Sequence, residues 1–123
     1  MGNQNDTELM LQAISEAQVY NQELSRACVE VHTHFQLGQF DEGIALLKRL
    51  LEGLGTVSEA IQLTHPVQAE KGLSLDLSAL PLTLKPLVEA LEHQDYGLAG
   101  DIVCYELRPL LDSWSAEFAK GTN

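Results

Sequence analysis

The sequence predicts an all-α fold, a four-helix antiparallel up-and-down bundle with a short third helix and an irregular connection over residues 66–79. Of the 123 residues, 45% are hydrophobic but only 6% are aromatic, and Leu and Ala dominate the apolar share, which favours helices over sheets. Apolar residues also recur at alternating spacings of three and four. The length allows one core but not two, so residues 1–123 are expected to form a single domain.

The first predicted helix has the clearest pattern. It begins after a cap at Asn5 or Asp6 and ends near Gln36, with Gly38 suited to the left-handed position just past the end. Residues spaced alternately by four and three form one apolar seam on this helix. The seam consists of Met10, Ile14, Ala17, Asn21, Leu24, Cys28, Val31 and Phe35.

The second predicted helix is capped by Asp41 and ends at His65, because Pro66 disfavours helical geometry in the residue before it. It continues the same alternation, which indicates a second face packed on the first helix. Its predicted seam consists of Ile44, Leu47, Leu51, Leu54 and Ile61, flanked by Leu50 and Val57.

The helical pattern lapses over residues 66–79. Leu73, Leu75 and Leu77 alternate with polar residues as in a strand, yet the chain offers no second strand to pair with. We expect an extended connection that lays these leucines on the bundle. The alternative is that they face a partner, as an edge that pairs across a dimer axis.

Two further helices complete the predicted bundle. The third runs from near Leu80 to about His93, and the fourth is capped by Asp95 and ends at Gly121. Pro109 lies inside the fourth helix and cannot bond the Tyr105 carbonyl, which predicts a kink. The expected apolar residues are Leu84, Leu87, Val88 and Leu91 in the third helix, and Tyr96, Ala99, Val103, Leu107, Leu110, Trp114 and Phe118 in the fourth.

Three polar residues lie on or beside the predicted seams. Asn21 occupies a core position, where an amide needs a partner and commonly fixes register or oligomeric state. Glu106, next to Tyr105 in a largely apolar helix, is expected to be partly buried and held by a hydroxyl or Arg108. The sequence therefore predicts a buried polar network of Asn21, Tyr105 and Glu106.

Small residues on the same helices are expected to pack tightly. Gly97 and Gly100 weaken the start of the fourth helix, and close approach to a neighbour would compensate. Cys28 and Cys104 should lie at the same height on neighbouring antiparallel helices. We expect both thiols to be buried, close and reduced, as apolar fillers.

No residues are predicted to be catalytic, cofactor-binding or metal-binding. Glu30 and His34, like Glu89 and His93, are four apart instead of the three of a di-metal Glu-x-x-His motif. The sequence also contains no phosphate-binding loop and no nucleophile motif. We therefore expect a protein that is not an enzyme and needs no cofactor.

Charge and hydropathy limit the partners and the location. With 18 acidic and 7 basic residues the formal charge is −11, which repels nucleic acids and anionic membrane surfaces. No apolar run approaches the roughly 20 residues that span a bilayer. The segment from Met1 to Thr7 is polar and unlike a secretory signal, so we expect a cytoplasmic protein.

The C-terminal stretch carries Asp95, Tyr96, Leu98, Asp101, Tyr105, Glu106, Leu107, Pro109, Leu111 and Trp114. In this pattern it resembles the tail of small, acidic, uncharacterised helical proteins of Gram-positive bacteria. The stretch from Phe40 to Gly43 is similar to their middle, so the resemblance covers about half of the chain. It implies a helical fold and a bacterial cytoplasm, and it implies no activity.

Two functions remain. The leading one is a non-enzymatic protein-interaction module, an adaptor or a secretion- or flagellar-chaperone-like bundle, whose exposed apolar groove receives a helix of a partner protein. The alternative is a small-molecule or metal-binding bundle with a pocket between helices. A short third helix also leaves leucines beside it uncovered, which favours a homodimer.

Overall fold

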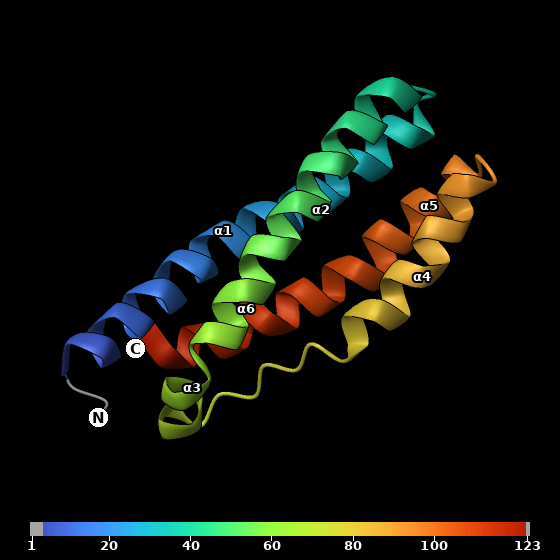
Figure 1. The fold of residues 1–123 in the computed structure, drawn as a ribbon. Helices are drawn as coiled ribbons and strands as arrows, with labels where there is room; N and C mark the ends of the chain where they lie inside the picture. Colours follow the sequence, from blue (N-terminus) through green and yellow to red (C-terminus); the bar gives the residue numbers. More distant parts are fainter. Residues whose placement is uncertain (1–3, 123) are drawn as a thin grey trace.

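A computed structural model describes residues 4–122 as a bundle of helices without β-strands (Figure 1). Residues 1–3 and 123, including the first part of the polar N-terminal segment, lie outside the described residues. Segments α5, η1 and α6 follow one another without a break and form one long rod, in which η1 is a π-helical turn. The elements are α1 (Gln4–Gln36), α2 (Phe40–Leu63), α3 (His65–Lys71), α4 (Ala79–Glu92), α5 (Tyr96–Ile102), η1 (Val103–Leu107) and α6 (Arg108–Thr122).

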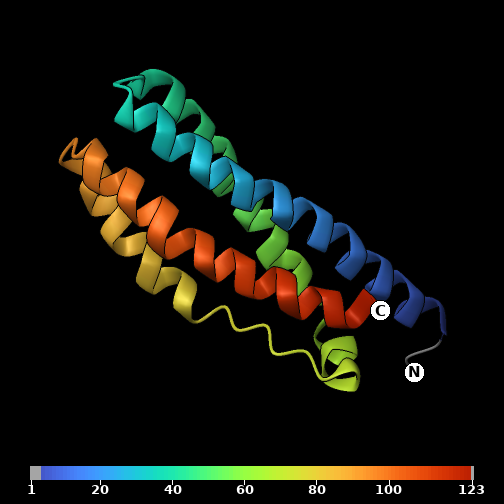
Figure 2. The same cartoon turned by 180° about the vertical axis from the view of Figure 1, so that it is seen from behind.

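The helices run alternately up and down, which confirms the predicted antiparallel bundle (Figures 1 and 2). Helix α1 packs along α2 on one side and along the α5–η1–α6 rod on the other. Helix α4 packs on α5 and η1, whereas α2 and α4 make almost no close backbone approach. Three of the four seams of the bundle are therefore closed, and the seam between α2 and α4 is open.

The predicted seam of α1 is confirmed. Its residues from Ile14 to Phe35 are buried, and Met10 is half-buried against the core. The predicted cap is wrong, because Asn5 and Asp6 both lie inside α1. An aspartate in the first turn of a helix is favourable there because it faces the positive end of the helix dipole.

Helix α2 turns a slightly different face to the core than predicted. Leu50 and Val57 are buried at its centre, whereas Ile44 is exposed and Leu51 is half-buried. The cause is the pair Gly43 and Gly53, which are also buried and let α1 approach closely. A Cβ on Gly53 would lie 2.6 Å from Leu24 Cδ2, and one on Gly43 would overlap the ring of Phe35.

Part of the predicted irregular connection is helical. Helix α2 ends at Leu63, and α3 begins at His65 with Pro66 in its first turn, where a missing N–H does no harm. The buried Gln68 side chain donates from Nε2 to the Ile61 carbonyl oxygen and to Thr64 Oγ1, joining the two helices across the break. Sequence periodicity alone missed this helix of about two turns because it is too short to show a pattern.

Residues 72–78, called the strap below, run from α3 to α4 along the α6 rod (Figures 1 and 2). Leu73, Leu75 and Leu77 are half-buried and pack on the core of this chain. This confirms the extended connection, whereas the alternative, in which these leucines face a partner across a dimer axis, stays a prediction. Their positions are held by α6, since Trp114 Nε1 donates to the Asp76 carbonyl oxygen at 3.3 Å.

A carboxylate on α6 fixes the start of the strap, and we predict that acid releases it. Glu117 accepts hydrogen bonds from Lys120 and from the Ser74 amide, and these bonds lower the pKa of Glu117. The contribution to stability is therefore present above the ordinary pKa of glutamate and is lost as pH falls through the lowered value. We expect the Ser74 amide resonance to titrate in that acid range in the wild type and not in Glu117→Gln.

The Ser78 amide provides an internal reference for this titration. Ser78 donates its N–H to Asp76 Oδ1 at 2.9 Å, and this bond lowers the pKa of Asp76. The Ser78 resonance should titrate equally in both proteins, because Glu117→Gln leaves Asp76 intact. A Ser74 titration that persists in Glu117→Gln would contradict the assigned role of Glu117.

The α5–η1–α6 rod begins at the predicted cap and changes its helical geometry near Pro109. Asp95 caps α5 by accepting a hydrogen bond from the Leu98 amide at 3.1 Å. The disturbance expected at Pro109 takes the form of the π-helical turn η1, in which the Arg108 N–H bonds the Val103 carbonyl five residues back. In α4, Leu87 and Ala90 are buried, whereas Val88 is exposed, contrary to its predicted core position.

The two glycines of α5 differ in how closely other residues pack against them. A Cβ on Gly100 would lie 3.2 Å from His32 Cδ2 of α1, which confirms the expected close approach. A Cβ on Gly97 would meet only Asp95 Oδ1 at 3.8 Å, so no close packing requires that glycine.

Within residues 4–122 no helix is long and apolar enough to cross a membrane.

Candidate functional site

The predicted polar residue of α1 lies in the core. Asn21 is 0% exposed, and its Nδ2 donates to the Leu111 carbonyl oxygen at 2.7 Å and to Ser115 Oγ at 2.8 Å. Its Oδ1 is buried and has no hydrogen-bond partner among the described residues. The expectation that Asn21 finds polar partners is therefore confirmed for the amide nitrogen and wrong for the amide oxygen.

The predicted network of Asn21, Tyr105 and Glu106 is wrong. Tyr105 is 66% exposed and Glu106 is also exposed. The reason is the π-helical turn, in which Val103 and Leu107 take the buried positions and the residues between them point outward. Tyr105 still contacts α1, where its ring meets the ring of His32 edge-on with the centroids 5.4 Å apart.

Polar pairs instead form a row along the seam between α1 and the last rod. Besides the Asn21 pair, Ser25 Oγ donates to Asp112 Oδ1 at 2.6 Å, and His32 Nε2 lies 3.1 Å from Asp101 Oδ1. The His32 side chain is 10% exposed, while that of Asp101 is largely exposed. These pairs satisfy polar groups at a helix interface and fix its register, so they have a structural role.

The cysteines lie on the same seam, and both thiols are free. Cys28 is buried as predicted, but Cys104 is only half-buried, because it belongs to the outward-turned part of η1. Burial, followed by the charge of the nearby Cys104, raises the pKa of the Cys28 thiol to about 12. A thiol that stays protonated at neutral pH is a poor nucleophile. Among the described residues, no group of three His, Cys, Asp or Glu side chains could hold a metal ion.

The open seam of the bundle contains an apolar groove of about 300 Å³, called the α2/α4 groove below. Its lining is apolar except for Ser58, and Val88 is 47% exposed at its edge. Four residues come from each helix. The lining consists of Leu51, Leu54, Gly55 and Ser58 from α2 and Leu80, Leu84, Leu87 and Val88 from α4.

Aromatic side chains join the start of α2 to α1 and to the start of α5. The rings of Phe40 at the start of α2 and Tyr96 at the start of α5 are stacked, with centroids 4.6 Å apart. Phe35 of α1 lies against both rings, with its centroid 5.4 Å from that of Tyr96. The start of α2 is therefore held to α1 and α5 by these rings, whereas the α2/α4 groove lies further along α2.

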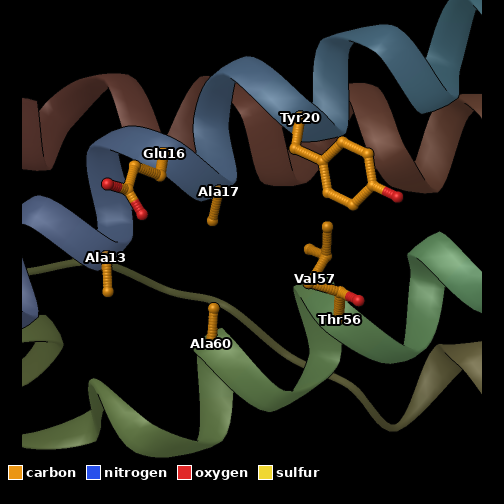
Figure 3. A pocket seen from close by; sticks show the side chains of 7 residues that line it. All are labelled: Ala13, Glu16, Ala17, Tyr20, Thr56, Val57 and Ala60. Atoms are coloured by element: carbon orange, nitrogen blue, oxygen red, sulfur yellow. The ribbon is translucent and has the colours of Figure 1, made fainter.

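A second hollow, of about 290 Å³, lies between α1 and α2. Figure 3 shows Ala17 and Tyr20 of α1 facing Val57 and Ala60 of α2, with Glu16 turned aside. Small side chains create this hollow, since alanines line it from both helices. Neither hollow is lined by Asn21, Tyr105 or Glu106.

Sequence reasoning did not identify the residues of either hollow. Periodicity indicates which residues are apolar but not how far two helices stand apart. The available signal for the α2/α4 groove was the short third helix, together with apolar residues on more than one face of the second and third helices.

Residues 12–117 match the family model described as "Domain of unknown function (DUF8042)", and the chain belongs to this family. The match extends from α1 into α6 and so includes both helices of the α2/α4 groove. No curated protein and no solved structure matches the chain.

Proposed function

We propose that this protein is a non-enzymatic interaction module, an adaptor or chaperone-like bundle whose α2/α4 groove receives one helix of a partner protein. The observation that carries the proposal is the open seam, which leaves an apolar groove between two antiparallel helices. A groove between antiparallel helices suits a third helix, because apolar side chains can interdigitate from both sides.

The dimensions of the α2/α4 groove fit a short amphipathic helix. From Leu51 to Ser58, α2 rises by about 10 Å, or two helical turns. Two turns accommodate apolar anchors at positions i, i+3, i+4 and i+7 of a docked helix. Docking would cover half-buried leucines and the exposed Val88, and burial of apolar surface contributes about 25 cal/mol per Å² before the costs of association.

Charge favours a basic partner helix. The chain carries a formal charge of −11, and a second copy would bring the same charge to the interface. Glu52 and Glu59 are exposed next to lining residues of α2, and Lys85 is exposed next to Leu84 of α4. The charges beside the groove are mixed, so the net charge of the whole chain sets the preference for a cationic partner.

A small-molecule or metal-binding role has less support. The hollow of about 290 Å³ between α1 and α2 is at the lower limit of ordinary ligand pockets, roughly 300–1,000 Å³, and the carboxylate of its one charged lining residue, Glu16, is turned aside (Figure 3). The resemblance of residues 95–114 to small acidic proteins of Gram-positive bacteria supports a cytoplasmic setting for the proposed interaction.

A designed peptide tests this function. The probe is a fluorescent peptide of about 18 residues, with leucines at i, i+3, i+4 and i+7 and mainly lysines elsewhere. We expect the full chain to bind it saturably, more weakly at high salt, and we expect Leu84→Glu to weaken binding at least about tenfold. A version of the peptide with glutamates in place of the lysines should bind less tightly.

Leu82→Glu is the matched control. Leu82 lies on the same helix, is 77% exposed and does not line the groove, so the same change there should leave binding unchanged. If Leu84→Glu loses helical circular dichroism, Val88→Glu replaces it at an exposed edge of the groove. No saturable binding by the wild type, or equal losses in Leu82→Glu and Leu84→Glu, would contradict the proposal. A wild-type dimer in sedimentation that Leu84→Glu dissociates would replace the partner helix with a second copy.

A further inference from the structure

Helix α2 contains one glycine that no packing within this chain explains. Gly43 and Gly53 face α1, where added Cβ atoms would collide with Phe35 and Leu24. A Cβ on Gly55 would meet nothing within 4 Å outside its own helix and immediate chain neighbours. Because glycine weakens a helix interior relative to alanine, its presence at this position has a cost that the folded chain does not recover.

The missing side chain of Gly55 enlarges the α2/α4 groove. Gly55 lines the groove between Leu51 and Ser58, which precede and follow it by about one turn of α2. The space over Gly55, called the Gly55 notch below, would be filled by any larger residue. The notch therefore lies on the surface that the partner helix is proposed to contact.

Beside the notch lies a hydroxyl without a partner. Ser58 Oγ is buried and makes no hydrogen bond with the described residues. Two other hydroxyls within helices of this chain bond a carbonyl of the preceding turn, since Thr33 Oγ1 bonds the Val29 carbonyl and Thr83 Oγ1 bonds that of Ala79. An unpaired buried hydroxyl is unfavourable unless a group from outside the chain completes its hydrogen bond.

We infer that the partner helix inserts one bulky apolar side chain into the Gly55 notch, and that the Ser58 side chain then turns its hydroxyl, which is buried in the free chain, outward to a polar group of the partner. This inference rests on the proposed function and adds a rule for the partner sequence. The partner is a basic amphipathic helix in which a large apolar residue has an amide or hydroxyl side chain one turn away or adjacent to it. Such a knob-in-hole contact fixes the register of the docked helix, which a smooth leucine groove would not do.

Gly55→Ala tests the notch and is expected to separate stability from binding. An added methyl group suits the helix and meets no neighbour, so we expect the melting temperature to rise by about 2–5 °C. The same methyl group occupies the notch, so we expect the probe peptide to bind about three- to tenfold more weakly. Gly97→Ala is the matched control, because a Cβ there is also nearly free of contacts but lies outside the groove.

A series of probe peptides locates the inserted side chain. Each leucine of the peptide is replaced in turn by alanine, and binding is measured to the wild type and to Gly55→Ala. One replacement should weaken binding to the wild type about tenfold and binding to Gly55→Ala much less, since the notch is already filled in the variant. With glutamine placed next to that leucine, Ser58→Ala should weaken binding about two- to fivefold.

The outcomes separate the two proposals. If the wild type binds the probe and Leu84→Glu abolishes binding, but Gly55→Ala binds as the wild type does, the notch inference is wrong and the proposed function stands. Equal sensitivity of wild type and Gly55→Ala to every leucine replacement would also overturn the notch. An unchanged affinity of Ser58→Ala for the glutamine peptide would overturn the polar contact. Absence of any binding by the wild type would overturn the proposed function itself.

Discussion

Replacing Asn21 with aspartate should lower the free energy of unfolding at pH 7 by about 3–5 kcal/mol. Asn21 is completely buried, and its Nδ2 donates to the Leu111 carbonyl oxygen and to Ser115 Oγ. An ionised carboxylate only accepts hydrogen bonds, so it would face the Leu111 oxygen without a donor between them. Denaturant unfolding followed by circular dichroism measures the loss.

The loss in Asn21→Asp should shrink in acid. Burial raises the pKa of the introduced carboxyl group above its unfolded value. Between the two pKa values the folded state binds the proton and the unfolded state does not, so lowering the pH favours folding of the variant. We expect the difference from the wild type to be smaller at about pH 5 than at pH 7.

Asn21→Leu is the control for packing. Leucine has a similar size and carries no charge, so we expect its stability to lie within about 1.5 kcal/mol of the wild type. If Asn21→Leu and Asn21→Asp lose the same stability, with no dependence on pH, then charge burial is not the cause and the assignment of the Asn21 hydrogen bonds is wrong.

Trp114→Ala is expected to lower the free energy of unfolding by about 3–5 kcal/mol. Trp114 is almost completely buried in the core, and its Nε1 also holds the strap through the Asp76 carbonyl oxygen. The variant loses both the buried indole and its hydrogen bond to the strap, so hydrogen-exchange protection of the Ser74 amide should fall as well. Urea unfolding by circular dichroism, which does not depend on the deleted indole, gives the stability.

Trp114→Phe separates the two contributions. Phenylalanine keeps most of the apolar contact and loses the N–H donor, so we expect a smaller loss of about 1–2 kcal/mol. Leu82→Ala, at an exposed position of α4, should change stability by no more than about 0.5 kcal/mol. A loss under about 1 kcal/mol in Trp114→Ala would contradict the central position of this side chain in the core.

Two kinds of feature could be predicted from the sequence: a long helix with periodic apolar residues, and a helix cap formed by a side chain close to it in sequence. The seam of α1 could be predicted because this helix packs on α2 and on the α5–η1–α6 rod, so its burial keeps one period from Ile14 to Phe35. Asp95 could be predicted as a cap because its side chain accepts a hydrogen bond from the amide of Leu98, only three residues further along the chain.

The parts that could not be predicted depend on contacts between helices. Gly43 and Gly53 rotate the buried face of α2 by admitting α1, and glycine contributes nothing to an apolar pattern. The π-helical turn moved Tyr105 and Glu106 out of the predicted network, and the sequence signalled only the disturbance at Pro109. The α2/α4 groove arises from the separation of two helices, which their individual sequences do not encode.

Methyl NMR of the full chain with the probe peptide tests the docking of a helix in the α2/α4 groove most directly. Saturable shifts are expected for the methyl groups of Leu51, Leu84 and Val88, and none for Leu9 or Leu63, which are exposed outside the groove. Shifts confined to Ala13, Ala17 and Ala60, in the hollow between α1 and α2, would contradict docking in the α2/α4 groove, as would no saturable shift at any methyl group.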